Sequence, residues 1–314
     1  MIGTTTTILL GLHLMFTIAS YSVDCFVTRH QIPLKSSFSS SFANEHATSS
    51  SSSCRFSSVT SSTAKSSSVD FTIAPSSEDD QSISQAAKFM IESFWLPQVS
   101  ADDQIISAHK ESYSGFTWAV THDLTQRYGQ ILGKRAFNSG LLVATANATP
   151  DGSNSAIVGL VAVDVALIDT ENNKLHNRET SENMLKDAMS SLGPKQRWQY
   201  KNSSVQEIVS DLLPSHTSVG VVLSNLAVNP SFRRNGVALD LCKEVERIAK
   251  EEWGFDKLCL RVESSNAAAR ALYEKKLKYH LIWTEKDAIA LRADLQSGNF
   301  VECASDTLTL VKAL

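Results

Sequence analysis

The residues best suited to chemistry form a short basic turn, Arg233-Arg234-Asn235-Gly236-Val237-Ala238, between a strand-like apolar run and a helix-like run. The first backbone N–H groups of a helix have no partner within the helix, and the helix dipole adds partial positive charge there. Gly236 has no Cβ, so the backbone can approach a ligand closely, and Ala238 keeps the first helical turn thin. The turn therefore predicts an anion site suited to a pyrophosphate.

The spacing of this turn excludes two common phosphate loops. The chain contains no Gly-x-x-x-x-Gly-Lys-Ser/Thr sequence, and no Gly-x-Gly-x-x-Gly follows a strand-like run. The spacing that does fit is Arg/Gln-x-x-Gly-x-Gly/Ala. A solvated basic loop before an ordinary helix is the alternative on these six residues alone, so the flanking segments decide between the two interpretations.

Two further signals flank the turn in a fixed order. Upstream stands the strand-like run Leu223-Ser224-Asn225-Leu226-Ala227-Val228, and downstream, after a second short strand, comes the helix-like run from Asn266 to Lys275. Asn266 falls at the start of this helix, where Asn is a good cap. Ala269 and Tyr273 are four residues apart, so they share one helix face.

In this order, the three segments resemble the GNAT (GCN5-related) N-acetyltransferase family, closely over residues 221–284 and weakly before them. The plastid acetyltransferases of plants and the bacterial ribosomal-protein N-terminal acetyltransferases are the most similar members. The resemblance implies the α/β (α+β) acyl-CoA N-acyltransferase fold, with a mixed, mostly antiparallel sheet of about seven strands flanked by helices. It also implies acetyl-CoA as co-substrate.

The resemblance further implies roles for individual residues. Acetyl-CoA would be bound by the strand end, the basic turn and the second helix: Leu226, Ala227, Val228, Arg233, Arg234, Asn235, Gly236, Val237, Ala238, Asn266 and Ala269. A backbone N–H of Leu226 or Val228 would polarise the thioester carbonyl, and Asn266 would hydrogen-bond the pantetheine or a phosphate. Tyr273 would protonate the leaving thiolate, with pure packing as its competing role.

The base that accepts the amine proton stays open between several groups. Glu263 follows the second short strand, and we take it with Tyr273 as the catalytic pair. Asp164 is a second candidate, because a carboxylate inside an apolar strand is costly without a partner. Family members often use water chains instead, and Glu274 is expected to be solvated.

One residue departs from the family pattern. Lys278 stands where Gly usually ends the second helix in the left-handed conformation, so a strained or different backbone is expected at this exit.

Composition limits the remaining chemistry. Residues 1–68 carry four basic and two acidic residues, or +2, so a total of −4 leaves −6 for the rest, which argues against broad nucleic-acid binding and suits a neutral or basic peptide. No pair of the five cysteines has metal-ligand spacing, and none is expected to bind a metal. Cys242 and Cys259 are expected to be ordinary buried thiols.

The first 68 residues are expected to be a targeting sequence, followed by one domain over residues 69–314. Residues 1–22 contain an apolar run typical of a signal peptide, and residues 23–68 are a Ser-rich, disordered transit-like segment. This two-part pattern resembles the address of complex plastids, with the secretory pathway or the mitochondrion as alternatives. No stable membrane anchor is expected once the leader is removed.

The domain is expected to begin with a strand at 69–74 and a helix to about residue 95, which opens within 76–80 with an N-cap and acidic residues in the first turn. Helical material is expected to continue over 101–132. A hairpin of 140–148 and 156–168 follows, then an insertion at 169–216 with helices at 181–192 and 203–213, and a last strand at 306–311. The aromatic side chains Trp95, Tyr113, Phe116 and Trp118 are expected either to cover the acceptor groove or to be core.

Three functions fit these observations. The first is acetyl transfer to a protein amine, an N-terminal α-amine or also a lysine side chain. The second is acetyl transfer to a small amine such as a polyamine or amino acid, and the third is an inactive CoA-binding protein.

Overall fold

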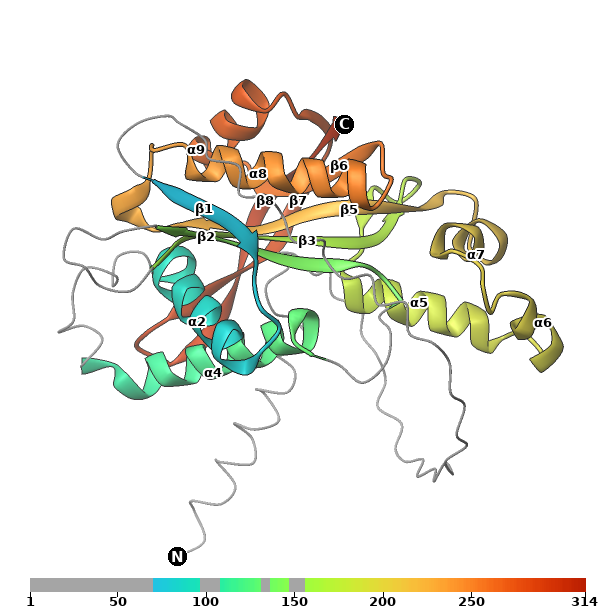
Figure 1. The fold of residues 1–314 in the computed structure, drawn as a ribbon, viewed down its shortest axis with the longest axis horizontal. Coiled ribbons are helices and arrows are strands. Elements are labelled where there is room, and N and C mark those ends of the chain that lie inside the picture. The colour runs from blue at the N-terminus through green and yellow to red at the C-terminus, as the bar shows by residue number, and fades with distance from the viewer. Residues whose placement is uncertain (1–69, 97–107, 131–135, 147–155) are drawn as a thin grey trace, which may run out of the picture.

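A single mixed sheet is the frame of the molecule (Figure 1). The computed structural model describes residues 70–96, 108–130, 136–146 and 156–314. Within these ranges eight strands follow the order β1-β2-β3-β5-β6-β8-β7, with β4 paired to β3. They are β1 (Phe71–Pro75), β2 (Ser139–Ala146), β3 (Ile157–Asp169), β4 (Lys174–Leu175), β5 (Thr217–Val228), β6 (Lys257–Glu263), β7 (His280–Asp294) and β8 (Asn299–Ala313). Among these described pairs β5 and β6 run parallel and the others antiparallel, so the predicted fold class is confirmed.

Helices cover both faces of the sheet, with α8 and α9 on one side and α2 and α4 on the other (Figure 1). The α-helices are α2 (Asp80–Met90), α4 (Lys110–Tyr128), α5 (Arg178–Ser190), α6 (Pro194–Gln199), α7 (Val205–Leu212), α8 (Val237–Arg247) and α9 (Ala267–Arg270). Wider π turns extend α2, α8 and α9 as η1 (Ile91–Trp95), η3 (Ile248–Glu252) and η4 (Ala271–Lys276), and η2 (Pro230–Phe232) is a short 3₁₀ turn.

The central strand β3 explains why both faces are covered. Successive strand residues point to opposite faces. Accordingly Val161 and Val163 join the core under α8, while Leu160 and Ala162 join the core under α2 and α4. Nearly every residue of β3 is buried, as expected of a strand between two helical layers.

The predicted hairpin of 140–148 and 156–168 is confirmed as β2 and β3. The first helix begins at the end of the predicted stretch 76–80. Its cap is Asp79, which accepts a hydrogen bond from the Ser82 N–H at 2.8 Å, so Ser76 and Ser77 precede the helix and only Asp80 lies in its first turn. Only 110–128 of the helix expected over 101–132 lies in α4, and its predicted flanks fall partly outside the described residues.

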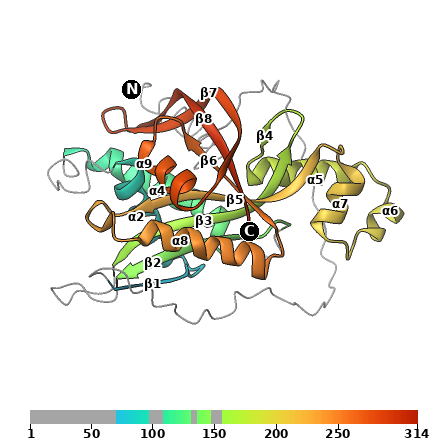
Figure 2. The same ribbon diagram turned by 90° about the horizontal axis from the view of Figure 1, so that it is seen from above.

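The insertion at 169–216 contains more structure than the sequence predicted. Its two expected helices are α5 and α7, and the structure adds β4 and α6. These three helices extend beyond the end of the sheet (Figure 2). The first part turns back at Asp169, which accepts hydrogen bonds from the N–H groups of Glu171 and Asn172, so β4 pairs with the end of β3.

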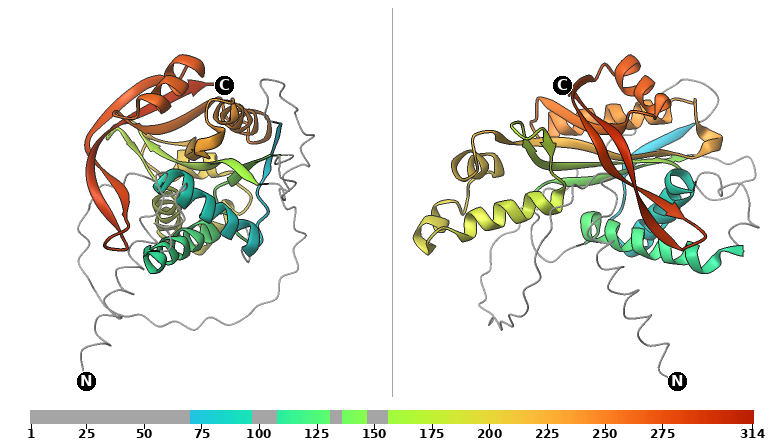
Figure 3. Two further views of the ribbon diagram at one scale, coloured as in Figure 1. Left: turned by 90° about the vertical axis from the view of Figure 1, so that its left-hand side faces the viewer. Right: turned by 180° about the vertical axis from the view of Figure 1, so that it is seen from behind.

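The C-terminal part of the chain contains more strand structure than the sequence predicted. In place of one strand at 306–311, β7 and β8 form a hairpin with 15 residues in each strand. Much of β7 is exposed and has no clean alternation of apolar and polar residues, which removes the usual sequence signal. Figure 3 shows the hairpin as a long twisted ribbon that crosses the molecule, and Phe300 near its tip packs on Trp95 and Phe116.

Candidate active site

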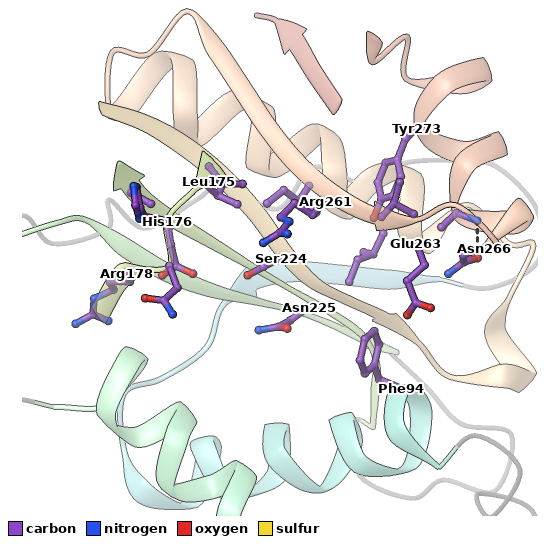
Figure 4. A pocket seen from close by; sticks show the side chains of 18 residues that line it. Phe94, Leu175, His176, Arg178, Ser224, Asn225, Arg261, Glu263, Asn266 and Tyr273 are labelled. Carbon is purple, nitrogen blue, oxygen red and sulfur yellow. Dashed lines mark hydrogen bonds between the residues drawn. The ribbon is translucent and has the colours of Figure 1, made fainter. Parts of the chain in front are cut away.

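A cavity opens where two neighbouring strands separate. β5 and β6 pair only through Val221–Leu223 and Leu258–Leu260. Beyond this point β5 runs on to Val228, whereas β6 stays paired with β8. Side chains from β3, β4, β5, β6, α9 and η4 line the resulting cavity, together with Phe94 (Figure 4).

A β-bulge shapes the β5 wall of the cavity. Ala162 lies opposite Ser224 and Leu160 opposite Ala227, so two residues of β5 face one residue of β3. Asn225, within the bulge, has φ +55°, a left-handed conformation that Asn tolerates better than most residues. Consecutive side chains from Ser224 to Leu226 therefore line the same cavity, which a regular strand would not allow.

The basic turn opens α8 as the sequence predicted. Gly236 is the N-cap residue with φ +89°, and no side chain caps the helix. A Cβ at this glycine would meet only Asp240 Oδ2, at 3.9 Å, so the backbone conformation, more than crowding, favours glycine here. The first N–H groups of α8 thus lack a side-chain partner and suit an anion.

Two residues of the turn also have structural roles. The Arg233 guanidinium donates to the carbonyl oxygens of Val228, at 3.2 Å, and Ser93, at 3.3 Å, so it ties the end of β5 to η1. Asn235 donates to the Phe232 carbonyl at 3.4 Å. Arg234 is exposed and has φ +70°.

The second signature lies on the opposite wall. Asn266 caps α9, because its Oδ1 accepts a hydrogen bond from the Ala269 N–H at 3.1 Å, which confirms the predicted cap. Asn266, Ala269 and Tyr273 all line the cavity. The predicted placement of the last two on one helix face is therefore also confirmed.

Tyr273 is 6% exposed and its ring packs edge-on against Tyr279, with ring centroids 5.9 Å apart. Burial, with a smaller contribution from Cys242, raises the pKa of the Tyr273 hydroxyl well above its ordinary value. The hydroxyl is therefore protonated at neutral pH and can donate a proton or a hydrogen bond into the cavity.

Both candidate bases lie in the same cavity. Glu263 is ion-paired with Arg292 and accepts a hydrogen bond from Ser305 Oγ at 3.0 Å. Asp164 accepts a hydrogen bond from the Tyr128 hydroxyl at 2.8 Å, which supplies the partner that its apolar strand requires. Figure 4 shows Glu263 at the same end of the cavity as Tyr273 and Asn266. Glu274 pairs with Arg270 and does not line the cavity.

The four aromatic residues proposed for the acceptor groove do not line this cavity. Trp95 and Phe116 are buried in the core beneath α2 and α4. Tyr113 donates to Glu92 at 2.6 Å, and Trp118 is 54% exposed. The aromatic residue that does line the cavity is Phe94, next to Trp95 in the wider turn η1.

The sequence prediction missed several polar residues of the cavity: His176, Asn177, Arg178, Ser224, Asn225 and Arg261. Ser224 and Asn225 carried a usable signal, because they are polar residues inside an otherwise apolar strand. His176 and its neighbours carried none, since they lie between the end of β4 and the first residue of α5, in the insertion.

The cavity contains no cysteine, and the described residues include no group of three or more His, Cys, Asp or Glu side chains arranged to hold a metal. The thiols of Cys242 and Cys259 are buried as predicted. Burial raises the pKa of Cys259 to about 11, so this thiol is inert at neutral pH.

A known protein family matches the segment that contributes much of the cavity lining. Residues 213–279 match the model of the acetyltransferase (GNAT) family. Over these residues the chain is similar to GNAT acetyltransferases. The matched segment contains β5 with its bulge, the basic turn, α8, β6 and the helix of Asn266 and Tyr273.

Individual relatives show the same likeness. Over 80 residues the chain is 35% identical to the N-alpha-acetyltransferase daf-31 of Caenorhabditis elegans. The aligned region covers 23% of this chain and 44% of the relative. The chain therefore spans less than half the length of the curated relative that it matches.

Two solved structures resemble the chain at low identity. Arabidopsis thaliana NAA60 in complex with acetyl-CoA has a TM-score of 0.39 and 15% identity, covering 78% of this chain and 98% of that chain. The ribosomal-protein-S18-alanine N-acetyltransferase from Escherichia coli has a TM-score of 0.35 and 12% identity, covering 77% and 93%.

Proposed function

We propose that the protein transfers an acetyl group from acetyl-CoA to an amine of a protein or peptide. The observation that carries this proposal is one cavity, formed where β5 and β6 separate, that Leu226, Asn266 and Tyr273 line together with polar side chains from the insertion. The uncapped start of α8 follows β5 directly in the chain. The family match and the N-alpha-acetyltransferase relative support the same chemistry.

Acetyl-CoA fits the wall between the basic turn and the bulge. Its pyrophosphate would accept hydrogen bonds from the first N–H groups of α8, with Arg234 as a nearby cation. Its pantetheine arm would run along the bulged end of β5, where the ladder is interrupted and backbone groups are free for a ligand. A backbone N–H of Leu226 or Val228 would then polarise the thioester carbonyl.

The transfer needs two proton movements. The neutral amine attacks the thioester carbon, so a C–N bond forms and the C–S bond breaks as the tetrahedral intermediate collapses. We propose that Glu263 removes the amine proton through water, because it lies at the Tyr273 end of the cavity (Figure 4). Tyr273, protonated at neutral pH, delivers a proton to the leaving thiolate.

The test is to incubate the full chain with acetyl-CoA and a peptide library and to map the products by mass spectrometry. We expect acetylation of N-terminal α-amines, with lysine side chains as a second product. Polyamines and free amino acids are assayed in parallel. Turnover of these small amines without any acetylated peptide would contradict the proposed acceptor, and binding of acetyl-CoA without any product would contradict enzymatic activity.

We also propose that the protein works in a plastid. The two segments that carry this prediction, 1–22 and 23–68, lie outside the described residues. Among the described helices none is long and apolar enough to cross a bilayer. A fluorescent protein fused behind residues 1–68 should enter the plastid of an algal host with a complex plastid, and secretion of the fusion into the medium would refute this address.

A further inference from the structure

Three uncharged polar side chains of the cavity have buried atoms without a hydrogen-bond partner in the protein. They are Ser224 Oγ, Asn225 Nδ2 and both ring nitrogens of His176. Asn225 is 7% exposed and His176 is 9% exposed. Buried polar atoms are nearly always hydrogen-bonded, because leaving one unsatisfied is costly. Three such groups in one cavity indicate a ligand that supplies their partners.

The fold places these three residues along the part of the cavity away from Tyr273. Ser224 and Asn225 are consecutive residues at the bulge of β5, which is why both reach the cavity. His176 follows β4 and is fixed by its backbone N–H, which donates to the Leu167 carbonyl at 2.9 Å. In Figure 4, His176 lies at the end opposite Tyr273, with Ser224 and Asn225 between. We call these three residues the polar wall.

The polar wall is neutral. Charged residues also line the cavity, but they are engaged elsewhere: Asp164 with Tyr128, Arg178 with Glu182, and Arg261 with Glu285. Burial lowers the pKa of His176, helped by the nearby charge of Lys174 and opposed by Asp169. Its ring is therefore neutral at pH 7 and offers one donor and one acceptor. A neutral group with its own donor and acceptor, such as a hydroxyl or a carboxamide, is the best complement.

We propose that the polar wall binds the side chain of the first residue of the acceptor peptide and selects a hydroxyl or carboxamide side chain over an apolar one. This inference rests on the proposed peptide acetylation. The amine must lie at the end of the cavity with Tyr273, and the side chain of the same residue then extends along Asn225 and Ser224. His176 closes the far end, so it contacts only the longer side chains.

An apolar side chain in this site would leave the polar atoms of the polar wall without hydrogen-bond partners, and this cost is the basis of the selection. A site built to hydrogen-bond a substrate group discriminates strongly against an analogue of the same shape that lacks the group, because the polar atoms of the site stay buried and unpaired. Isosteric pairs of acceptors therefore measure the polar wall directly. Suitable pairs are peptides that differ only at the first residue, Thr against Val, Asn against Leu, and Gln against Met.

The experiment compares kcat/KM within each pair for the full chain at saturating acetyl-CoA. We expect the wild-type protein to favour the polar member at least about tenfold in each pair. Asn225→Gly, which removes the amide and still permits the left-handed backbone, should reduce all three ratios to within about threefold. His176→Leu should reduce chiefly the Gln/Met ratio.

Thr309→Val is the matched control. Its hydroxyl is equally buried and unpartnered but lies on β8 and does not line the cavity, so all three ratios should match wild type. Equal kcat/KM within the pairs for the wild-type protein would overturn the inference while leaving peptide acetylation intact. This test uses the wild-type protein alone, so it does not depend on the folding of any variant. Absence of acetylation for every peptide would instead refute the proposed function itself.

Discussion

The two walls of the cavity are built in different ways. The wall proposed for acetyl-CoA comes from one continuous segment, 213–279, in which strand, turn and helix follow each other along the chain. The wall proposed for the acceptor combines Ser224 and Asn225 of β5 with residues of η1, β3 and the 174–178 part of the insertion, which meet β5 only in the fold. Substitutions in the first wall should change acetyl-CoA binding, whereas substitutions in the second should change which acceptor is acetylated.

The two helices of the continuous segment differ at their first turns. α9 is capped by the side chain of its own Asn266, whereas α8 begins at Gly236 without a side-chain cap. Of these two helices, α8 therefore leaves more of its first N–H groups for an external acceptor. This contrast favours α8 over α9 for the proposed phosphate contact.

The largest effect is expected at Tyr273. Tyr273→Phe keeps the ring and removes the hydroxyl, so kcat should fall about 10²-fold, the lower end of general-acid assistance, while acetyl-CoA affinity stays nearly constant. The measurement is kcat at saturating acetyl-CoA, with the melting temperature recorded in parallel. Wild-type turnover in this variant would remove Tyr273 from the mechanism and leave it as core.

Gly236→Asp should have the next largest effect. It strains the left-handed N-cap and places a negative charge beside the phosphate site, so acetyl-CoA binding should weaken by about 2 kcal/mol, or about 30-fold in Kd. Calorimetry measures this change. Gly254→Asp is the control, because Gly254 is exposed with φ +73° and has no neighbour within 4 Å of an added Cβ. Unchanged affinity in Gly236→Asp would refute the assignment of this turn.

Two substitutions at Asn266 distinguish its role as a helix cap from its proposed role in binding acetyl-CoA. Asn266→Ala removes the cap oxygen and should lower the free energy of unfolding by about 1 kcal/mol. Asn266→Asp keeps an acceptor for the Ala269 N–H but loses the amide donor, so its stability should stay near wild type while its acetyl-CoA affinity falls a few-fold. Denaturant unfolding and calorimetry check both. Wild-type affinity in the Asp variant would mean that Asn266 only caps the helix.

The smallest effect is expected at the exit of the second helix. Lys278 is exposed and has φ +65°, a left-handed conformation in which a non-glycine residue is strained, so of the two backbones expected here the structure has the strained one. Lys278→Gly should raise the free energy of unfolding by about 0.5 kcal/mol, after subtracting the greater entropy of glycine in the unfolded chain. The control Lys276→Gly, inside the last helical turn, should destabilise the protein. A lower melting temperature in Lys278→Gly would show that Lys278 is not strained.

Features that depend on neighbours in the chain follow from the sequence alone. The helix that opens at the basic turn, the Asn266 cap, and the shared face of Ala269 and Tyr273 follow from capping, backbone sterics and helical periodicity, which act over four residues or fewer. Because these rules are local, the wall of 213–279 is predictable from the order of its residues.

The other features arise only when distant segments pack together. Pairing of β4 with β3 brings His176 to a cavity lined by Ser224 and Asn225, although about fifty residues separate them in the sequence. The β7–β8 hairpin, in which the largely exposed β7 lacks a periodic signal, places Arg292 beside Glu263. Such contacts depend on which strands pair and how they are offset, and this register is set by long-range packing, to which local sequence patterns contribute little.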